Sequence, residues 1–518
     1  MIHPYSHYPA RAARHWPDHT AIIDGERSVT FAELDGHAEA IARNLAAAGL
    51  IPGDRVAILQ HNCLEYVLAV VGIARAGGVV VPMLGALTEP EHAFIRADSG
   101  ARFVVALTEP QLDRAWRIAE NRAAVLTVGA SSAGSGLLAG DAPDAGQRIV
   151  VDRPTSSLAQ VLYTSGTTGR PKGVTHSYAS TAAAMNFWAG VLRLTPADRV
   201  LGQLPLSHFC GRVMDSAWIG GAALVVLNSA EPGTVIAAIT RWGITHMLTV
   251  PTALRSLLDD PAIDEARLGS LRAVVYAAAP AAPSLVERAI ARLGPVLHTG
   301  YGQTEAYGLN TFMGPEEHLD AIRNDRARLA SVGREYANAQ IRITDADGTP
   351  CRTGEVGEIR ICAPWVTPGF WQRPDLDAER LQDGWLRTGD LGRMTPDGYL
   401  HLADRMEDMI ISGGYNVYPA EVEHALMAHN AVAECAVFAV PDEKWGEAVY
   451  AAVVLRPGCA ANAEELIDFA KTKLAKFKVP KKVLFRTELP RTAVGKVLRR
   501  NLREPYWQVH GRQIHGAE

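Results

Sequence analysis

The sequence predicts an α/β protein with two or more domains, for three reasons. First, 518 residues exceed what one hydrophobic core usually holds. Second, helix-like and strand-like patterns alternate near the N-terminus, which favours parallel sheets joined by helices. Third, the pattern changes at about residue 330 to short alternating strands and after residue 405 to a compact α+β region.

The N-terminal elements are predicted from apolar spacing and capping residues. A helix begins after Thr30, a suitable N-cap residue, and ends at Gly49, and its apolar residues recur at helical spacing. A strand is expected over 55–59, a helix over 63–76 and a strand over 79–82. Further strands are expected over 158–162 and 296–298. Residues 129–146 are rich in Gly, Ala and Ser and are expected to form a loop.

The C-terminal third is predicted to hold short strands followed by mixed elements. Strands are expected over 340–344, 357–362 and 399–402, with Asp-Gly turns at 347–348 and 397–398. After them we expect a helix over 419–428, strands over 432–440 and 448–455, and a helix over 463–474. This change of pattern places a domain boundary at about 403–408.

Composition and charge exclude several classes of protein. A net charge of −5 favours neither a nucleic-acid partner nor a membrane surface. The six cysteines form no CxxC pair, so neither a zinc site nor a disulfide framework is predicted. The N-terminus lacks the apolar core of a secretory signal, and the longest apolar stretch, 66–81, is too short to span a bilayer. We expect a soluble cytoplasmic protein.

Residues 163–174 read YTSGTTGRPKGV and follow an expected strand. Glycines let successive backbone N–H groups converge on an anion, hydroxyl groups add donors, and Lys172 adds a positive charge. The spacing is not that of a Walker A loop, because Pro171 stands where a glycine is required. A flexible linker is the alternative, but a strand-flanked lysine and proline are unusual in linkers. The predicted phosphate-binding residues are Thr164, Ser165, Gly166, Thr167, Thr168, Gly169 and Lys172.

This loop resembles the phosphate loop of the adenylate-forming superfamily, which includes acyl- and aryl-CoA synthetases, luciferases and peptide-synthetase adenylation domains. Further motifs occur in the family's order, namely YGQTE at 301–305, WLRTGD at 385–390, DRMED at 404–408 and PRTAVGKVLR at 490–499. The resemblance covers about residues 15–505. It implies a large N-terminal domain of two αβ layers with a small β-barrel subdomain, and a small mobile α+β C-terminal domain. The implied boundaries are 1–403, a hinge at 404–408, and 409–518.

The YGQTE motif is chemically suited to ATP and its metal. A glutamate can bind the Mg²⁺ that accompanies ATP, a threonine can donate to a phosphate, and a tyrosine can face the adenine. By resemblance, Glu305 is the magnesium ligand and Thr304 contacts the α-phosphate. Tyr301, Gly302 and Gln303 line the nucleotide pocket.

The ribose and the reacting phosphate are assigned to two further motifs. A carboxylate can accept from both ribose hydroxyls, and the resemblance implies that Asp390 does so beside Arg405. By the same resemblance Lys496 is the adenylation lysine. Its charge would bridge the substrate carboxylate and the α-phosphate as negative charge develops. Taken without the family, Asp390 would be a turn residue and Lys496 one of several basic surface residues.

The acyl side of the site is implied by two shorter segments. His208, in PLSHFCG, is predicted to gate or orient the acid, although a lone histidine is usually structural. Ala277, Ala278 and Ala279 stand where the family has a GGAPL-like strand, with both glycines replaced by alanine. Each added methyl group should narrow or reshape the pocket. We therefore expect an aryl, alicyclic or short acyl acid rather than a long straight fatty acid.

The resemblance also implies a hinge and an acceptor site. Glu407 is the predicted hinge residue, where most relatives have Lys or Asp. Gly413, Gly414 and Tyr415 are predicted to line the path of the pantetheine arm of coenzyme A. Two interpretations of a basic cluster stand, a solvated helix face or attraction of CoA phosphates. Its members are Lys471, Lys473, Lys476, Lys478, Lys481 and Lys482.

The implied reaction activates a carboxylic acid with ATP and Mg²⁺, releases pyrophosphate, and passes the acyl group to the thiol of coenzyme A. A carrier-protein thiol or a separate partner is the alternative acceptor. A luciferase-like oxidation of the adenylate and a non-catalytic scaffold are more distant alternatives. Nucleic-acid and membrane partners are not expected, and the oligomeric state stays open, a homodimer included.

Overall fold

The computed structural model describes residues 1–106, 110–127, 135–136, 148–164, 171–208, 211–279, 281–412, 415–442, 444–491 and 497–508. The chain divides into two compact units. Unit 1 comprises Met1–Ile341 and Ile361–Leu386, and unit 2 comprises Arg342–Arg360 and Arg387–Glu518. The predicted hinge at 404–408 concerns motion between domains and stays a prediction.

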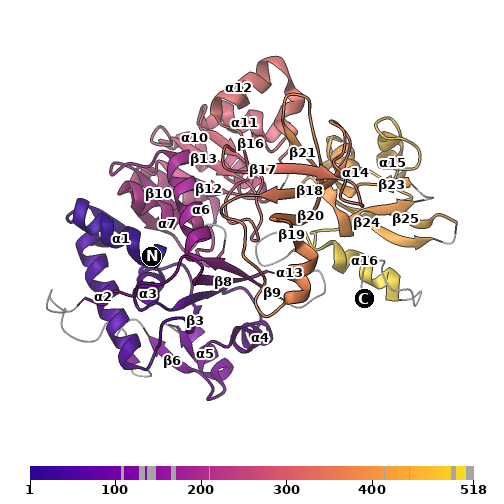
Figure 1. Ribbon diagram of the computed structural model, residues 1–518. Helices are drawn as coiled ribbons and strands as arrows, with labels where there is room; N and C mark the ends of the chain where they lie inside the picture. Colours follow the sequence, from indigo (N-terminus) through magenta and orange to yellow (C-terminus); the bar gives the residue numbers. More distant parts are fainter. Residues whose placement is uncertain are drawn as a thin grey trace. The chain divides into compact units, whose positions relative to one another are not determined.

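Unit 1 contains two seven-stranded sheets (Figure 1). The first sheet is parallel except at its edge, where β2 runs antiparallel to β1. Its strands in spatial order are β14 (Leu297–Thr299), β13 (Ala273–Tyr276), β12 (His246–Thr249), β10 (Arg199–Gly202), β11 (Ala223–Val226), β1 (Thr20–Asp24) and β2 (Arg27–Thr30).

The second sheet is also parallel except at one edge, where β9 runs antiparallel to β8. Its strands in spatial order are β7 (Ser135–Gly136), β6 (Ala124–Thr127), β5 (Phe103–Val105), β3 (Arg55–Leu59), β4 (Val79–Met83), β8 (Leu158–Thr164) and β9 (Lys172–Ser177). The short strand β7 lies within the segment that the sequence predicted as a loop, because its two residues pair with the end of β6.

Helices fill the space between the two sheets and cover their outer faces. Helix α3 contacts β1 of the first sheet and β4 of the second, and α6 on the second sheet packs against α7 on the first. Helices α4 and α5 cover the outer face of the second sheet (Figure 1). The helices are α1 (Pro4–His15), α2 (Phe31–Ala47), α3 (Leu64–Arg75), α4 (Glu89–Ser99), α5 (Gln111–Ala119), α6 (Tyr178–Leu192), α7 (Gly211–Gly220), α8 (Pro232–Trp242), α9 (Pro251–Asp259), α10 (Ala262–Glu265), α11 (Pro283–Leu293) and α12 (Pro315–Asn324).

The remaining elements of unit 1 are short. A two-stranded ribbon forms from β15 and β16, and α13 precedes the hairpin strand β19. Their bounds are β15 (Thr311–Phe312), η1 (Arg326–Ala330), β16 (Arg334–Glu335), α13 (Pro374–Arg380) and β19 (Leu381–Gln382).

The predicted N-terminal elements are confirmed. Thr30 caps α2 in a capping box, with its hydroxyl accepting from the Glu33 N–H and the Glu33 carboxylate accepting from the Thr30 N–H. The buried face of α2 contains the apolar residues found at helical spacing together with Asp35 and Glu39, which pair with Arg75. Elements β3, α3 and β4 follow within a residue or two of their predicted bounds. The two αβ layers implied by the family resemblance are present.

Unit 2 contains a half-barrel sheet in the order β17-β18-β20, with β21 antiparallel to β20. This is the β-rich segment predicted from the Asp-Gly turns. The strands are β17 (Gln340–Thr344), β18 (Gly357–Cys362), β20 (Trp385–Met394) and β21 (Leu400–Arg405).

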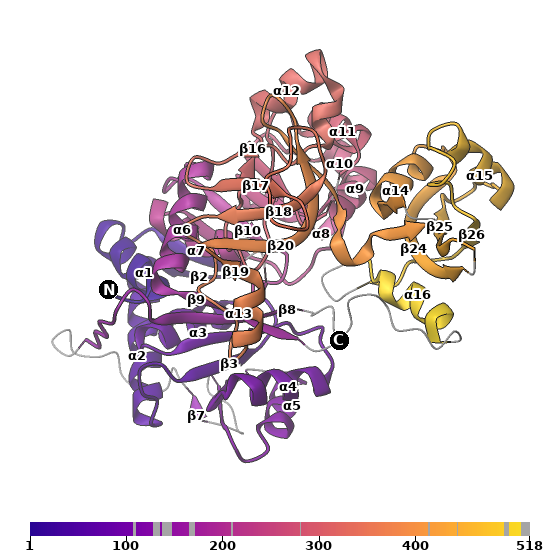
Figure 2. The ribbon, with the colours of Figure 1, turned by 45° about the vertical axis from the view of Figure 1, so that its right-hand side comes forward.

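The rest of unit 2 is an α+β domain around a second sheet, β23-β22-β25-β24, with β26 pairing with β25. Helices α14 and α15 pack against one face, and α16 packs against the other (Figure 2). The elements are η2 (Met406–Asp408), β22 (Ile410–Ser412), β23 (Tyr415–Val417), α14 (Pro419–Met427), β24 (Val432–Asp442), β25 (Gly446–Leu455), α15 (Ala463–Lys471), β26 (Lys482–Phe485) and α16 (Arg499–Gln508). Among the described residues, no helix is both long and apolar enough to cross a bilayer.

Candidate nucleotide and acyl site

The predicted phosphate loop connects two paired strands. Strands β8 and β9 form an antiparallel hairpin whose last pair joins Thr164 and Lys172. Thr164, one of the predicted phosphate-binding hydroxyl residues, therefore stands directly opposite Lys172 at the start of the loop. Residues 165–170 lie outside the described residues, so the predicted ligands Ser165, Gly166, Thr167, Thr168 and Gly169 stay predictions.

The base of this hairpin is firmly anchored. The Tyr163 hydroxyl donates to Asp98 Oδ2 at 2.6 Å, and burial together with that carboxylate raises the pKa of Tyr163. A Cβ atom on Gly173 would lie 2.9 Å from Val161 Cγ1 and 3.0 Å from Trp371 Cβ. Glycine is therefore required at 173 by close packing, and Tyr163 has a structural hydrogen bond.

The YGQTE segment follows β14 and is held by its neighbours. The Tyr301 N–H donates to Thr311 Oγ1 at 2.9 Å, and the Asn310 N–H donates to the Tyr301 carbonyl at 2.7 Å. A Cβ atom on Gly302 would lie 2.6 Å from the Gly308 carbonyl oxygen, so only glycine fits there without a shift of the backbone. The Tyr301 side chain is buried.

Two hydrogen bonds hold the backbone at Thr304 and Glu305, and one of them comes from β9, the strand that follows the phosphate loop. His176 in β9 is fully buried, and its Nε2 donates to the Thr304 carbonyl at 2.9 Å. The Thr367 N–H donates to the Glu305 carbonyl at 2.7 Å. The loop and the Thr304–Glu305 pair are thus joined through one strand. The sequence analysis missed His176, because its partner lies 128 positions away.

The residues around Glu305 fit the metal that the family resemblance implies. Mg²⁺ usually keeps several waters and is bound by one or two carboxylates together with substrate phosphates. One partly buried carboxylate, such as that of Glu305, is therefore an adequate protein ligand for Mg²⁺ bound with ATP. In the described ranges, no group of three or more His, Cys, Asp or Glu residues could hold a metal without a substrate.

The segment that precedes His208 is held by hydrogen bonds from Asn62, which lies in another part of unit 1. The Asn62 amide donates to the carbonyls of Leu204 and Leu227 at 2.9 and 3.1 Å, and its Oδ1 accepts from the Leu206 N–H at 2.9 Å. The His208 N–H donates to the Pro205 carbonyl at 3.0 Å. Asn62 is a second positioning residue that the sequence did not indicate.

The predicted acyl-pocket alanines follow β13. Ala277 is buried, whereas Ala278 and Ala279 are exposed. Ala278 has φ +71°, in the left-handed region that favours glycine. Replacing the family's glycine by alanine therefore strains the backbone as well as adding a methyl group. The expected narrowing of the acyl pocket stays a prediction.

The predicted ribose-binding pair lies in unit 2 and is brought together by strand register. Asp390 in β20 stands directly opposite Arg405 in β21. The Asp390 N–H donates to Thr388 Oγ1 at 3.0 Å, and Thr388 Oγ1 donates to the Ile359 carbonyl at 2.6 Å. These bonds fix the backbone at Asp390, as expected for a carboxylate that is to accept hydrogen bonds from the two ribose hydroxyls.

Comparison with known families decides the assignment. The profile of the AMP-binding enzyme family matches residues 9–371, and that of the AMP-binding enzyme C-terminal domain matches residues 421–496. The chain belongs to the AMP-binding enzyme family. The predicted membership of the adenylate-forming superfamily is thereby confirmed.

Similar proteins match nearly the whole chain. Feruloyl-CoA synthase from Amycolatopsis sp is 36% identical over 512 residues, covering 96% of this chain and 98% of the relative. A fatty acid–[acyl-carrier-protein] ligase, ScoC, from Streptomyces coeruleorubidus is 33% identical over 510 residues, covering 97% and 96%. Among solved structures, the amide bond synthetase McbA from Marinactinospora thermotolerans has a TM-score of 0.90 at 33% identity, covering 97% and 100%.

Several predicted residues of this AMP-binding enzyme lie outside the described residues. They are Lys496, Gly413 and Gly414, and the side chains of Arg405 and Glu407 are likewise not described. Tyr415 begins β23, is 59% exposed, and stacks on Phe477 with ring centroids 4.7 Å apart. An exposed tyrosine, stacked on the partly buried Phe477, therefore stands directly after the predicted pantetheine-path glycines.

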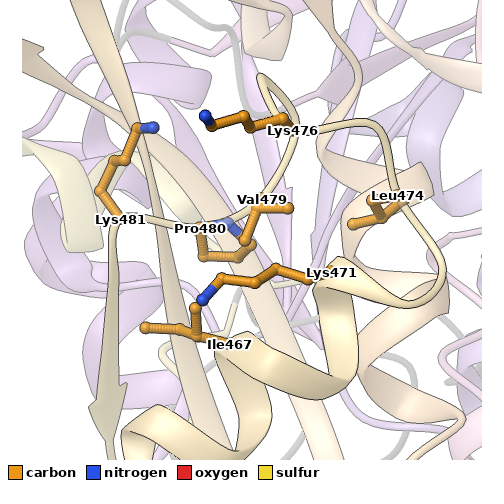
Figure 3. A pocket seen from close by; sticks show the side chains of 7 residues that line it. All are labelled: Ile467, Lys471, Leu474, Lys476, Val479, Pro480 and Lys481. Carbon is orange, nitrogen blue, oxygen red and sulfur yellow. The ribbon is translucent and has the colours of Figure 1, made fainter.

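Part of the basic cluster lines a pocket of about 460 Å³ in unit 2 (Figure 3). Lys471, Lys476 and Lys481 border it together with apolar residues such as Ile467 and Val479. Lys471 also pairs with Asp468 at 2.7 Å. Lys478, which does not border the pocket, is paired with Glu421 at 2.7 Å.

Proposed function

We propose that this AMP-binding enzyme is an AMP-forming carboxylate–CoA ligase. The single observation that supports this most strongly is the anchoring of Thr304 to the strand that leaves the phosphate loop, within a chain that matches the two family profiles over residues 9–371 and 421–496. The family uses ATP, Mg²⁺ and coenzyme A.

In the first half-reaction the substrate carboxylate attacks the α-phosphorus of ATP, the bond to the β-phosphate breaks, and pyrophosphate leaves. No protein nucleophile is needed, so catalysis consists of positioning and charge stabilisation. We assign Lys172 and the loop hydroxyls to the polyphosphate, and Thr304 to the α-phosphate. Lys496 neutralises the charge that develops between the carboxylate and the α-phosphate. Mg²⁺ bound at Glu305 would offset the negative charge of the phosphates.

The ribose end is assigned to unit 2. Asp390 accepts from the ribose hydroxyls, and Arg405 stands beside it in the strand register. Tyr301 contributes a buried aromatic wall to the nucleotide pocket, with Gly302 and Gln303 forming its backbone.

In the second half-reaction a thiol attacks the acyl carbon and AMP leaves. Lys496 would obstruct that approach, so the C-terminal domain turns about the hinge at Glu407 between the two steps. We propose that the pantetheine arm passes Gly413, Gly414 and Tyr415. Lys476 and Lys481 would attract the CoA phosphates, in keeping with their place at the pocket in unit 2.

The acid is proposed to be compact, aryl or alicyclic. The alanines at 277 and 278, in place of the family's glycines, support a reshaped acyl pocket, to which His208 is also assigned by the family resemblance. The relative that acts on feruloyl groups supports an aryl acid, while the fatty acid ligase among the relatives supports a chain-like one. Adenylation measured against acids of increasing chain length separates the two, and an optimum at long straight fatty acids would contradict the proposal.

The second candidate is a ligase that loads a carrier-protein thiol, supported by the similarity to ScoC. The two candidates differ in their product when the protein is supplied with ATP, Mg²⁺, a panel of acids and CoA. We expect acyl-CoA and AMP, whereas acyl-AMP that accumulates without thioester would favour the carrier-protein ligase. A cytoplasmic location without nucleic-acid or membrane partners belongs to the same proposal, and light scattering would test for a homodimer.

A further inference from the structure

Two carboxylates flank the predicted hinge residue in unit 2. Asp404 precedes Glu407 by three positions, and Asp408 follows it directly. Both side chains lie near the same guanidinium, that of Arg499 at the start of α16. Because one carboxylate lies on each side of Glu407, their contacts need not respond alike when the chain turns at that residue.

Arg499 binds three carboxylates from two segments. Its Nη1 donates to Asp408 Oδ2 at 3.0 Å and lies 3.8 Å from Asp404 Oδ1. Its Nη2 donates to Glu423 of α14 at 2.8 and 2.9 Å. Burial by itself would lower the pKa of Arg499, but the carboxylates outweigh it and raise that pKa. The guanidinium thus stays charged and joins the hinge segment to the body of the C-terminal domain.

Asp404 has a second contact with that domain. Its Oδ2 accepts from the Ala420 N–H at 2.7 Å, in the first turn of α14. Only 3% of its side chain is exposed. A carboxylate that is this deeply buried needs hydrogen bonds and an opposite charge to offset its lost hydration, and here Ala420 and Arg499 supply them.

A rotation of the C-terminal domain about Glu407 would break the contacts of Asp404 but keep those of Asp408. A turn at residue 407 moves Asp408, Ala420, Glu423 and Arg499 as one body, because all of them follow the hinge. Asp404 precedes Glu407 and does not move with them. The Arg499–Asp408 and Arg499–Glu423 pairs therefore persist through the rotation, whereas the contacts of Asp404 belong to one orientation only.

The strand register identifies that orientation. Asp404 stands opposite Leu391, next to the Asp390–Arg405 pair assigned to the ribose. Arg499 follows Lys496 by three residues, a chain length that spans at most about 11 Å. Contact between Arg499 and Asp404 therefore limits how far position 496 can lie from the Asp390–Arg405 pair, and a short distance is what adenylation requires.

We propose that Asp404 is a positioning residue that selects the adenylation orientation, through the Ala420 N–H and the Arg499 guanidinium. The inference rests on the proposed function, since it needs two half-reactions in two orientations. It assigns Asp408 a different role, an ion pair that is kept in both orientations. The pair of residues offers a matched comparison within one segment.

The test compares Asp404→Asn with Asp408→Asn in the full-length protein. Each variant removes one negative charge next to Arg499, and asparagine at 404 still accepts from the Ala420 N–H. Acyl-AMP formation is measured in a single turnover with ATP and acid, and thioester formation is measured separately from acyl-AMP and CoA. Thermal unfolding of both variants shows whether they are folded.

We expect Asp404→Asn to slow acyl-AMP formation about fivefold, with thioester formation unchanged or faster, because a charged hydrogen bond is replaced by a neutral one in one orientation. Asp408→Asn should leave the ratio of the two rates unchanged. A uniform loss in both half-reactions of Asp404→Asn, or the same change of ratio in both variants, would overturn the inference.

Failure of the proposed function gives a different result. If the wild-type protein forms acyl-AMP but no CoA thioester, the proposed acceptor is wrong. In that case only the rate of acyl-AMP formation can be measured, and this rate alone tests the positioning role of Asp404. A rate that is lower in Asp404→Asn than in Asp408→Asn still supports the positioning role, and equal rates in the two variants contradict it.

Discussion

His176 offers the sharpest test of how the phosphate loop is coupled to the predicted magnesium ligand. It is fully buried in β9, and its Nε2 donates to the Thr304 carbonyl at 2.9 Å. Its ring packs on Tyr307 with centroids 4.4 Å apart. Replacing it with leucine introduces an apolar side chain of similar size and removes the donor.

The expected cost follows from that one hydrogen bond. A buried carbonyl that loses its donor costs about 1–3 kcal/mol of stability. If the Thr304–Glu305 backbone moves by about 1 Å to find another partner, the adenylation rate falls about 100-fold. His176→Gln places an amide donor in the same region and should recover part of both losses.

Two assays measure the effect. Urea unfolding gives the change in stability, and acid-dependent ATP–pyrophosphate exchange at saturating substrates gives the adenylation rate. We expect His176→Leu to lower both the free energy of unfolding and the adenylation rate. His176→Gln should give values of both quantities between those of His176→Leu and the wild type. A rate for His176→Leu within twofold of the wild type would refute the coupling, whatever the stability.

Four further predictions follow from single features. Ala278→Gly relieves a φ of +71° and should raise the free energy of unfolding by about 1 kcal/mol in urea, whereas a loss would contradict the strain argument. Gly302→Ala would place a Cβ atom 2.6 Å from the Gly308 oxygen, so pyrophosphate exchange should fall at least about tenfold, and an unchanged rate would show that the backbone yields. Burial lowers the pKa of His298 from 6.5 to about 4, so the unfolded chain binds the proton more readily between these values. The free energy of unfolding should therefore fall as the pH drops from about 6.5 to about 4, by at most about 3 kcal/mol, and a His298→Phe variant that keeps the full pH dependence would contradict this. Glu305→Gln should raise the Mg²⁺ concentration for half-maximal pyrophosphate release at least about tenfold, and an unchanged Mg²⁺ dependence would remove Glu305 as the ligand.

Local patterns were sufficient to predict much of the fold. The helix after Thr30, the strand at 55–59 and the strand before the phosphate loop depend on apolar spacing, capping residues and turn chemistry, all of which operate over a few residues. The Asp-Gly turns likewise predicted the short strands of the half-barrel sheet. The helix predicted over 463–474 ends earlier in the structure, where α15 covers Ala463–Lys471. Apolar periodicity predicts that a helix exists more reliably than it predicts where the helix ends.

The contacts that position the site could not be predicted in this way. His176 and Thr304 are 128 residues apart, and Asn62 and Leu206 are 144 apart. Such pairs depend on how the two sheets and their loops pack, which no local pattern encodes. The strain at Ala278 is similar, since the left-handed conformation is imposed by the surrounding structure rather than preferred by alanine.

The nucleotide products formed in the presence of a carboxylic acid test the central claim most directly. The purified protein would be incubated with ATP, Mg²⁺, CoA and a panel of aryl, alicyclic and straight-chain acids, and the nucleotide and thioester products would be quantified together. We expect AMP, pyrophosphate and acyl-CoA in equal amounts, formed only when an accepted acid is present. Formation of ADP and phosphate, or AMP formation that does not depend on an acid, would contradict attack of the carboxylate on the α-phosphorus.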